Sequence, residues 1–256
     1  MNFLILSLIL LLFAEPAMAW GPGMHFFLGQ RLLEMGIIGG SLGALLRSNR
    51  EHFLYGNIIA DVIVGKNMID YEDHSHNWDV ARKLRKHSSN PDQKAFATGY
   101  WTHLAADTVA HNLFLDEQET PSTITTSTMD HIYLELLADT WIPDSIPAQV
   151  TDLLSEDFAS HRQFLEETVP RTVFPFSVNW FLTDNLLKYT GRGTTRAVAN
   201  SLRRLHREDF QLDRMEFFSE LSLDRMGESL DENSSRIVHI NPIAGGSRFT
   251  PRQKTR

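Results

Sequence analysis

The chain has 256 residues, 42% of them hydrophobic and 22% charged, which is typical of globular proteins and long enough for one sizeable domain. Its formal net charge of -8 gives no reason to expect long-range attraction to a nucleic-acid backbone. The absence of cysteine excludes a fold that depends on disulfides. Leu, Ala, Met, Glu and Arg dominate while alternating runs of Val, Ile and Thr are scarce, which favours an all-α fold.

The first residues have the pattern of a secretory signal peptide. An apolar run from Phe3 to Phe13 precedes Ala17-Met18-Ala19, which has the A-x-A form of a cleavage site. The run is too short to span a bilayer well. Cleavage after Ala19 would make Trp20 the first residue of a secreted or periplasmic protein. Its free α-amine would then be a competent metal ligand, with His25 five residues further on.

A single acidic residue and a pair of histidines follow. Asp61 is a lone carboxylate in an apolar segment, where it is either a helix cap or a ligand. His74 and His76 lie in a polar turn, and such histidines are usually solvated. Beyond them, residues 82–90 are basic and polar, and we interpret them as an exposed connection.

The central segment, Gly99 to His111, combines helical composition with regularly spaced ligand-type residues. Its only glycine is the first residue, and Ala and Leu fill the gaps, which predicts a helix. His103, Asp107 and His111 then fall at i, i+4 and i+8 on one stripe. Their neighbours are small or apolar, so the stripe faces the interior, where unpaired polar groups are costly and a metal would justify them. The alternative is a polar surface stripe or hydrogen-bonded core histidines.

After a Thr/Ser/Pro-rich loop, the segment Met129 to Leu137 is again helical in pattern. It places His131 and Glu135 at i, i+4 on one face, as a ligand pair or as a surface pair. Residues 146 to about 230 read as amphipathic helices. We therefore expect a signal peptide at 1–19, one helical domain at 20–240 and a basic, disordered tail at 241–256.

In their order along the chain, these segments resemble the zinc-dependent phospholipase C family, which also includes nucleases of the P1/S1 type. The resemblance covers about Trp20 to Glu135. It is carried by Trp20 with His25, Asp61, H-x-W-D at His76 to Asp79, H-x3-D-x3-H at His103 to His111, and H-x3-E at His131 to Glu135.

The resemblance implies a mostly helical fold that holds about three zinc ions on nitrogen and oxygen ligands. One site would use Asp61, His76, His103 and Asp107. The second would use the amine and carbonyl of Trp20 with His25, and Asp107 would bridge the two. The third would use His111, His131 and Glu135. Asp61 is also the candidate general base. Two features depart from the family: His111 comes two residues earlier than in well-known members, and His74 competes with His76.

The expected activity is that of a secreted zinc-dependent phosphodiesterase, which hydrolyses phospholipid head-group phosphodiesters by a metal-activated water. A transient contact with a membrane surface is expected, and no protein partner is inferred. The alternatives are a P1/S1-type nuclease for single strands, a D-type phospholipase, and a non-catalytic metal- or lipid-binding protein of the cell envelope. The acidic chain favours lipid over nucleic acid.

Overall fold

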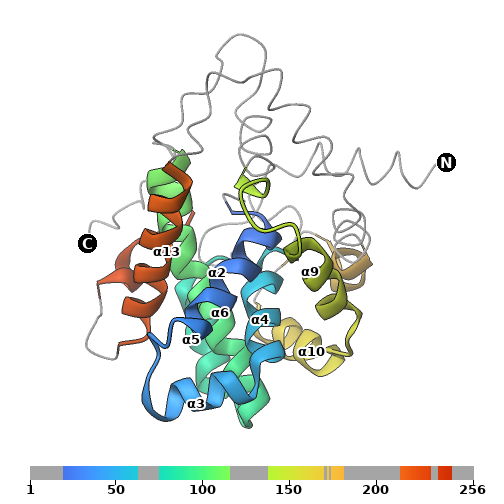
Figure 1. Ribbon diagram of the computed structural model, residues 1–256. Helices are drawn as coiled ribbons and strands as arrows, with labels where there is room; N and C mark the ends of the chain where they lie inside the picture. The colour runs from blue at the N-terminus through green and yellow to red at the C-terminus, as the bar shows by residue number, and fades with distance from the viewer. Residues whose placement is uncertain are drawn as a thin grey trace, which may run out of the picture.

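The computed structural model describes residues 20–62, 75–115, 138–169, 172, 174–181, 214–231 and 236–243. All regular secondary structure within these ranges is helical, which confirms the predicted all-α class (Figure 1). The elements are α2 (Pro22–Glu34), α3 (Gly40–Ser48), α4 (Arg50–Ile59), α5 (Trp78–His87), α6 (Pro91–Val109), α9 (Ile146–Ser155), α10 (Ala159–Thr168) and α13 (Met215–Ser229), the 3-10 turns η1 (Ala60–Val62) and η6 (Ile237–His239), and the π-helical segment η4 (Ala110–Phe114).

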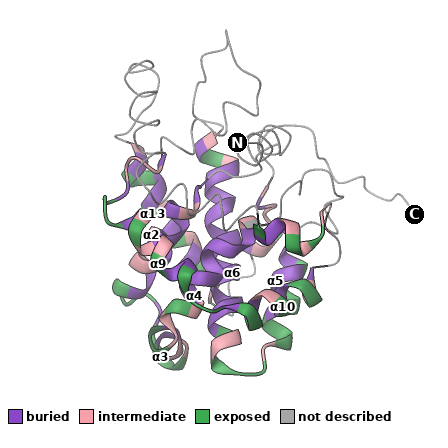
Figure 2. Cartoon of the chain, turned by 90° about the vertical axis from the view of Figure 1, so that its right-hand side faces the viewer, coloured by how far each residue is buried: buried purple, intermediate pink, exposed green. Residues whose placement is uncertain are grey.

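Helix α6 is the central element, and α2, α4, α5 and α13 pack around it (Figure 1). Its start is well defined because Pro91 occupies the first turn and the Asn90 side chain accepts a hydrogen bond from the Gln93 amide at 2.8 Å. Every residue from Ala95 to Val109 is buried (Figure 2). A helix buried on all sides carries its polar residues into the interior, so His103 and Asp107 are core residues.

Helices α4 and α6 touch through their backbones. A Cβ atom on Gly56 would lie 2.1 Å from the carbonyl oxygen of Phe96, and one on Gly99 would lie 2.0 Å from that of Phe53. Only glycine allows such an approach, because any side chain would collide with a backbone atom that has little freedom to move. The contact brings the end of α4, with Asn57 and then Asp61, beside the ligand-type residues of α6.

Trp20 anchors the start of α2 in the core. Its side chain is fully buried and its ring lies 4.5 Å from that of Phe114 in η4. The indole N–H donates a hydrogen bond of 3.2 Å to the hydroxyl of Ser222 on α13. The residue predicted to begin the mature chain is therefore fixed on two sides.

Two segments differ from the expectation. Most of residues 82–90 are exposed, as predicted, but the prediction of a connection there is wrong, because α5 runs to His87. The Asn77 side chain caps α5, and Trp78, Ala81 and Leu84 form a buried stripe at intervals of three residues. Basic residues between these positions hide the stripe in the sequence.

The second difference is at the end of α6. The helix passes into the π-helical segment η4 at Ala110, whose N–H contacts the carbonyl oxygens of Ala106 and Asp107. A π turn holds an additional residue, so side chains beyond it leave the i, i+4 register. His111 is the second residue of this segment and is buried, so the regular α-helical spacing assumed between Asp107 and His111 holds only as far as Val109.

None of the described helices combines the length and apolar character that a membrane crossing requires. Residues 1–19 and 244–256, which include the predicted signal peptide and most of the predicted tail, lie outside the described residues. The proposed domain boundaries therefore stay predictions.

Candidate metal centre

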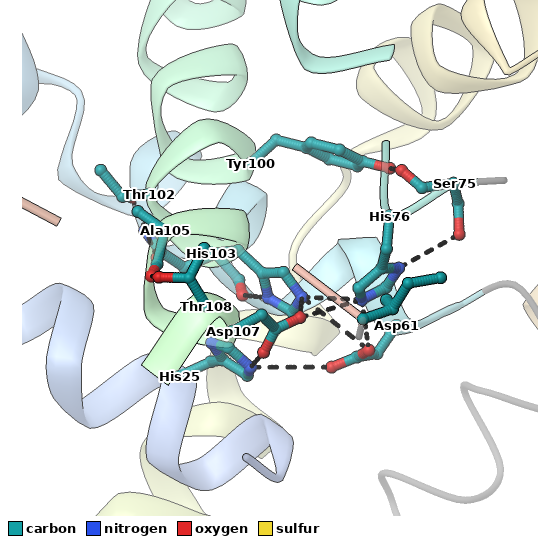
Figure 3. Close-up of polar contacts among 12 residues, drawn as sticks. His25, Asp61, Ser75, His76, Tyr100, Thr102, His103, Ala105, Asp107 and Thr108 are labelled. Atoms are coloured by element: carbon teal, nitrogen blue, oxygen red, sulfur yellow. Dashed lines mark hydrogen bonds and ion pairs between the residues drawn. The ribbon is translucent and has the colours of Figure 1, made fainter. Parts of the chain in front are cut away.

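Five ligand-type side chains from different parts of the fold meet beside the last two turns of α6 (Figure 3). They form two overlapping groups within the described residues, and the ligand atoms of each group lie within 4.8 Å of one another. Asp61 comes from η1, His76 from the segment before α5, and His25 from α2. The groups are His25, Asp61 and His103, and His76, His103 and Asp107.

The carboxylate of Asp107 lies between the imidazoles. Its Oδ1 is 3.2 Å from Nε2 of His25, and its Oδ2 is 3.1 Å from Nε2 of His103 and 3.3 Å from Nε2 of His76. The two oxygens thus face different histidines. This is the arrangement that a carboxylate bridging two cations requires.

Asp61 approaches the same space from the opposite side. Its Oδ1 is 2.9 Å from Nε2 of His76 and 3.8 Å from Nε2 of His103, and its Oδ2 is 4.0 Å from Nε2 of His25. Only 5% of the Asp61 side chain is exposed. Two nearly buried carboxylates so close to each other require positive charge between them.

The hydrogen bonds of His103 determine whether its Nε2 carries a proton or a lone pair. Nδ1 lies 2.7 Å from the carbonyl oxygen of Asn57, which can only accept, so Nδ1 carries a proton. In the neutral ring, Nε2 then directs a lone pair at Nε2 of His76, 3.0 Å away, and at the carboxylates. Converging lone pairs repel one another unless a proton or a metal ion lies between them.

The pKa shifts agree with this picture. Burial raises the pKa of Asp107, but His103 and His25 outweigh burial and hold it well below its ordinary value. Burial lowers the pKa of His103, but Asp107 and Asp61 outweigh burial and raise it. The pKa of His25 is lowered by burial and by His103, so His25 favours the neutral form that binds metals.

The donor set fits a divalent cation. Both ring nitrogens of His25 and Oδ1 of Asp107 are buried, and none makes a well-directed hydrogen bond within the described part of the chain. Such atoms are costly unless something binds them. Nitrogen and carboxylate ligands without sulfur are typical of catalytic zinc sites.

Comparison with known families shows which kind of metal-binding protein this is. The family described as zinc-dependent phospholipase C matches residues 24–172. The chain belongs to this family. No curated protein and no solved structure gives a significant match. Family membership confirms the resemblance predicted from the sequence, and it makes the protein a zinc-dependent phosphodiesterase of the phospholipase C type.

The family assignment and the geometry support the same residues, whose role as ligands stays a prediction. His25, Asp61, His76, His103 and Asp107 converge as the resemblance implied. Trp20 lies just before the matched range and is buried at the start of α2. His111 is buried but belongs to neither group. His74, His131 and Glu135, which the resemblance placed at or near the metals, lie outside the described residues.

A second layer of hydrogen bonds holds the ligands and was not predicted from the sequence. The phenol of Tyr100 donates to the carbonyl oxygen of Ser75 at 2.5 Å, and the Ser75 hydroxyl lies 3.2 Å from Nδ1 of His76. The hydroxyl of Thr102 donates to Oδ1 of Asn57 at 3.1 Å, next to the carbonyl that orients His103. Contacts of this kind fix the rings of metal-binding histidines.

We expect Tyr100→Phe to weaken zinc binding through His76. The substitution leaves the buried carbonyl of Ser75 without its donor, which costs about 1–3 kcal/mol of unfolding free energy. Because Ser75 precedes His76, zinc affinity should fall by about 10-fold. Urea denaturation of the zinc-free protein and competition with a chelator measure the two effects.

Tyr55→Phe is the matched control for this substitution. The Tyr55 hydroxyl accepts a hydrogen bond from Arg162 at 3.2 Å, away from the metal centre. This variant should lose stability and keep its zinc affinity. Equal zinc affinities in wild type and Tyr100→Phe would show that Tyr100 does not position His76.

Proposed function

We propose that the protein hydrolyses the head-group phosphodiester of phospholipids outside the cytoplasm. The observation that supports this most directly is the buried cluster of three histidines and two aspartates in a chain of the zinc-dependent phospholipase C family. The acidic net charge of -8 favours a lipid over a single-stranded nucleic acid. The signal-peptide pattern at residues 1–19 supports export, to the periplasm or beyond the cell.

In this proposal the converging residues hold zinc in at least two positions. Asp61, His76, His103 and Asp107 would hold one ion, and His25 with the amine and carbonyl of Trp20, together with Asp107, would hold another. His111, His131 and Glu135 would hold a third. Bound zinc supplies Lewis acidity toward the phosphoryl oxygens and lowers the pKa of water.

The protein's own groups perform the remaining steps. The carbonyl of Asn57 keeps the proton of His103 on Nδ1, so Nε2 stays available as a ligand. Asp61 would act as the general base and accept the proton of the water that attacks phosphorus. As the bond between phosphorus and the glycerol oxygen breaks, that proton would pass to the leaving oxygen. Asp61 suits this role because its carboxylate lies at the centre, with Oδ1 2.9 Å from Nε2 of His76. Whether the protein binds a lipid or a nucleic acid then depends on the protein surface around the metal centre.

The deciding experiment combines zinc content with substrate choice. Protein that begins at Trp20 is analysed for zinc and assayed on phosphatidylcholine vesicles and on single-stranded DNA. We expect about three zinc ions per chain and release of the phosphorylated head group. His103→Ala should lose the ion of the site that contains His103, and with it the hydrolysis. The control is His87→Ala, which changes an exposed histidine on α5 and should keep both properties.

Each other outcome points to a different function. Preferred cleavage of DNA would assign the nuclease activity, and release of a head group without its phosphate would assign D-type cleavage. Zinc without hydrolysis of either substrate would support a metal-binding envelope protein. A zinc-free protein would refute the proposal.

A further inference from the structure

The first turn of α2 has no cap of its own. Gly21 is the N-cap residue and has no side chain to accept a hydrogen bond, and the first turn contains no acidic residue. The first N–H groups of a helix need acceptors from elsewhere. Here the acceptor is Asp139, 115 residues away in the sequence, whose Oδ1 accepts from the Met24 amide at 3.2 Å.

The backbone around this carboxylate is shaped to fit it. A Cβ on Gly21 would lie 2.8 Å from Oδ2 of Asp139 and 3.0 Å from its Cγ and Oδ1. A Cβ on Gly23 would lie 3.1 Å from Oδ2 and 2.8 Å from the side chain of Ile142. Glycine at both positions is what allows Asp139 to lie directly against the start of the helix.

His25 lies in this same turn. Its amide donates the first hydrogen bond of α2, 3.0 Å to the carbonyl oxygen of Gly21. Its Nε2 faces Asp107 at 3.2 Å. Trp20 fixes one side of the turn by its bond to Ser222. Without Asp139, the other side would lose the acceptor that holds Met24.

We propose that Asp139 is a positioning residue of the metal centre, which caps α2 and thereby holds His25 toward Asp107. A carboxylate at a helix N-terminus is also favoured by the helix dipole. The inference rests on the proposed role of His25 as a zinc ligand. Asp139 itself acts through the helix backbone and touches neither substrate nor metal in this proposal.

The test measures the zinc affinity of each ion by competition with a chelator, in wild type, Asp139→Ala and Asp139→Asn. We expect Asp139→Ala to lower the affinity for the most loosely held zinc ion by about 10-fold or more. Asp139→Asn keeps an acceptor oxygen for the Met24 amide, so its affinity should stay within about 3-fold of wild type.

Asp157→Ala is the matched control, because it also removes an aspartate whose carboxylate accepts a hydrogen bond from an amide in the first turn of a helix. Oδ1 of Asp157 accepts from the Ala159 amide at 3.0 Å at the start of α10, which carries none of the proposed ligands. This variant should lose stability without losing zinc. An equal loss of zinc affinity in Asp157→Ala and Asp139→Ala would overturn the inference, because the effect would then be general destabilisation.

Gly21→Ala tests the same contact from the other side. Its methyl group would displace the Asp139 carboxylate, so it should weaken the same ion, and the two changes together should cost less than their sum. Wild-type zinc affinity in both Asp139→Ala and Gly21→Ala would overturn the inference and leave the proposed function standing. A wild type without zinc would overturn the proposed function together with it.

Discussion

Replacement of Asp107 by Asn is expected to remove two zinc ions at once and to lower kcat/KM by about three orders of magnitude, which corresponds to several kcal/mol of transition-state stabilisation. The two oxygens of this carboxylate face different histidines, His25 at 3.2 Å and His103 at 3.1 Å. An amide offers one oxygen and no negative charge. It therefore leaves at least one ion without its shared ligand and both with less negative charge around them.

Elemental analysis and the phosphodiester assay measure this effect, and circular dichroism confirms that the variant is folded. Asp92→Asn is the matched control, since Asp92 lies on the exposed first turn of the same helix, with 51% of its side chain accessible. It should keep zinc and activity. Full zinc content in Asp107→Asn would show that Asp107 does not bridge two ions.

Gly99→Ala is expected to lower the unfolding free energy by about 3 kcal/mol or more, at the upper end of what overpacking costs. The new methyl group would lie 2.0 Å from the carbonyl oxygen of Phe53, so α4 and α6 must separate. Asn57 lies in the last turn of α4 and Asp61 follows that helix, while His103 belongs to α6. The same displacement should therefore weaken zinc binding as well as the fold.

Urea denaturation with and without zinc measures both consequences. Gly39→Ala is the control because Gly39 has φ of -89° and no atom within 4 Å of a Cβ built on it. We expect that variant to stay within about 0.5 kcal/mol of wild type. A Gly99→Ala variant of equal stability would mean that the two backbones do not touch as described.

The sequence predicted the parts of the centre that depend on local spacing or on family motifs. His103 and Asp107 lie one helical turn apart, and their apolar neighbours indicated burial, which the structure confirms. His25, Asp61 and His76 are isolated in the sequence, and only the resemblance placed them near α6. Their convergence is a property of tertiary packing that no local pattern contains.

The residues that hold the ligands were not predicted, for a physical reason. Asn57 acts through its backbone carbonyl, Tyr100 through a bond to another carbonyl, and Asp139 through a distant helix end. Neither the side-chain type nor its spacing reveals such contacts. The π-helical turn at His111 was also missed, because the prediction assumed a regular helical period through His111, whereas the α-helix is regular only as far as Val109.

The origin of the five donors has a consequence for the stability of the protein. They come from residues 25 to 107, on separate segments that meet only when α2, α4 and α6 are packed together. An unfolded chain therefore has no comparable affinity for zinc, and the ion acts as a ligand of the native state. At free zinc 100 times its dissociation constant, one such site adds about 2.7 kcal/mol to the unfolding free energy. Available zinc would thus set the protein's resistance to heat and proteases as well as its activity.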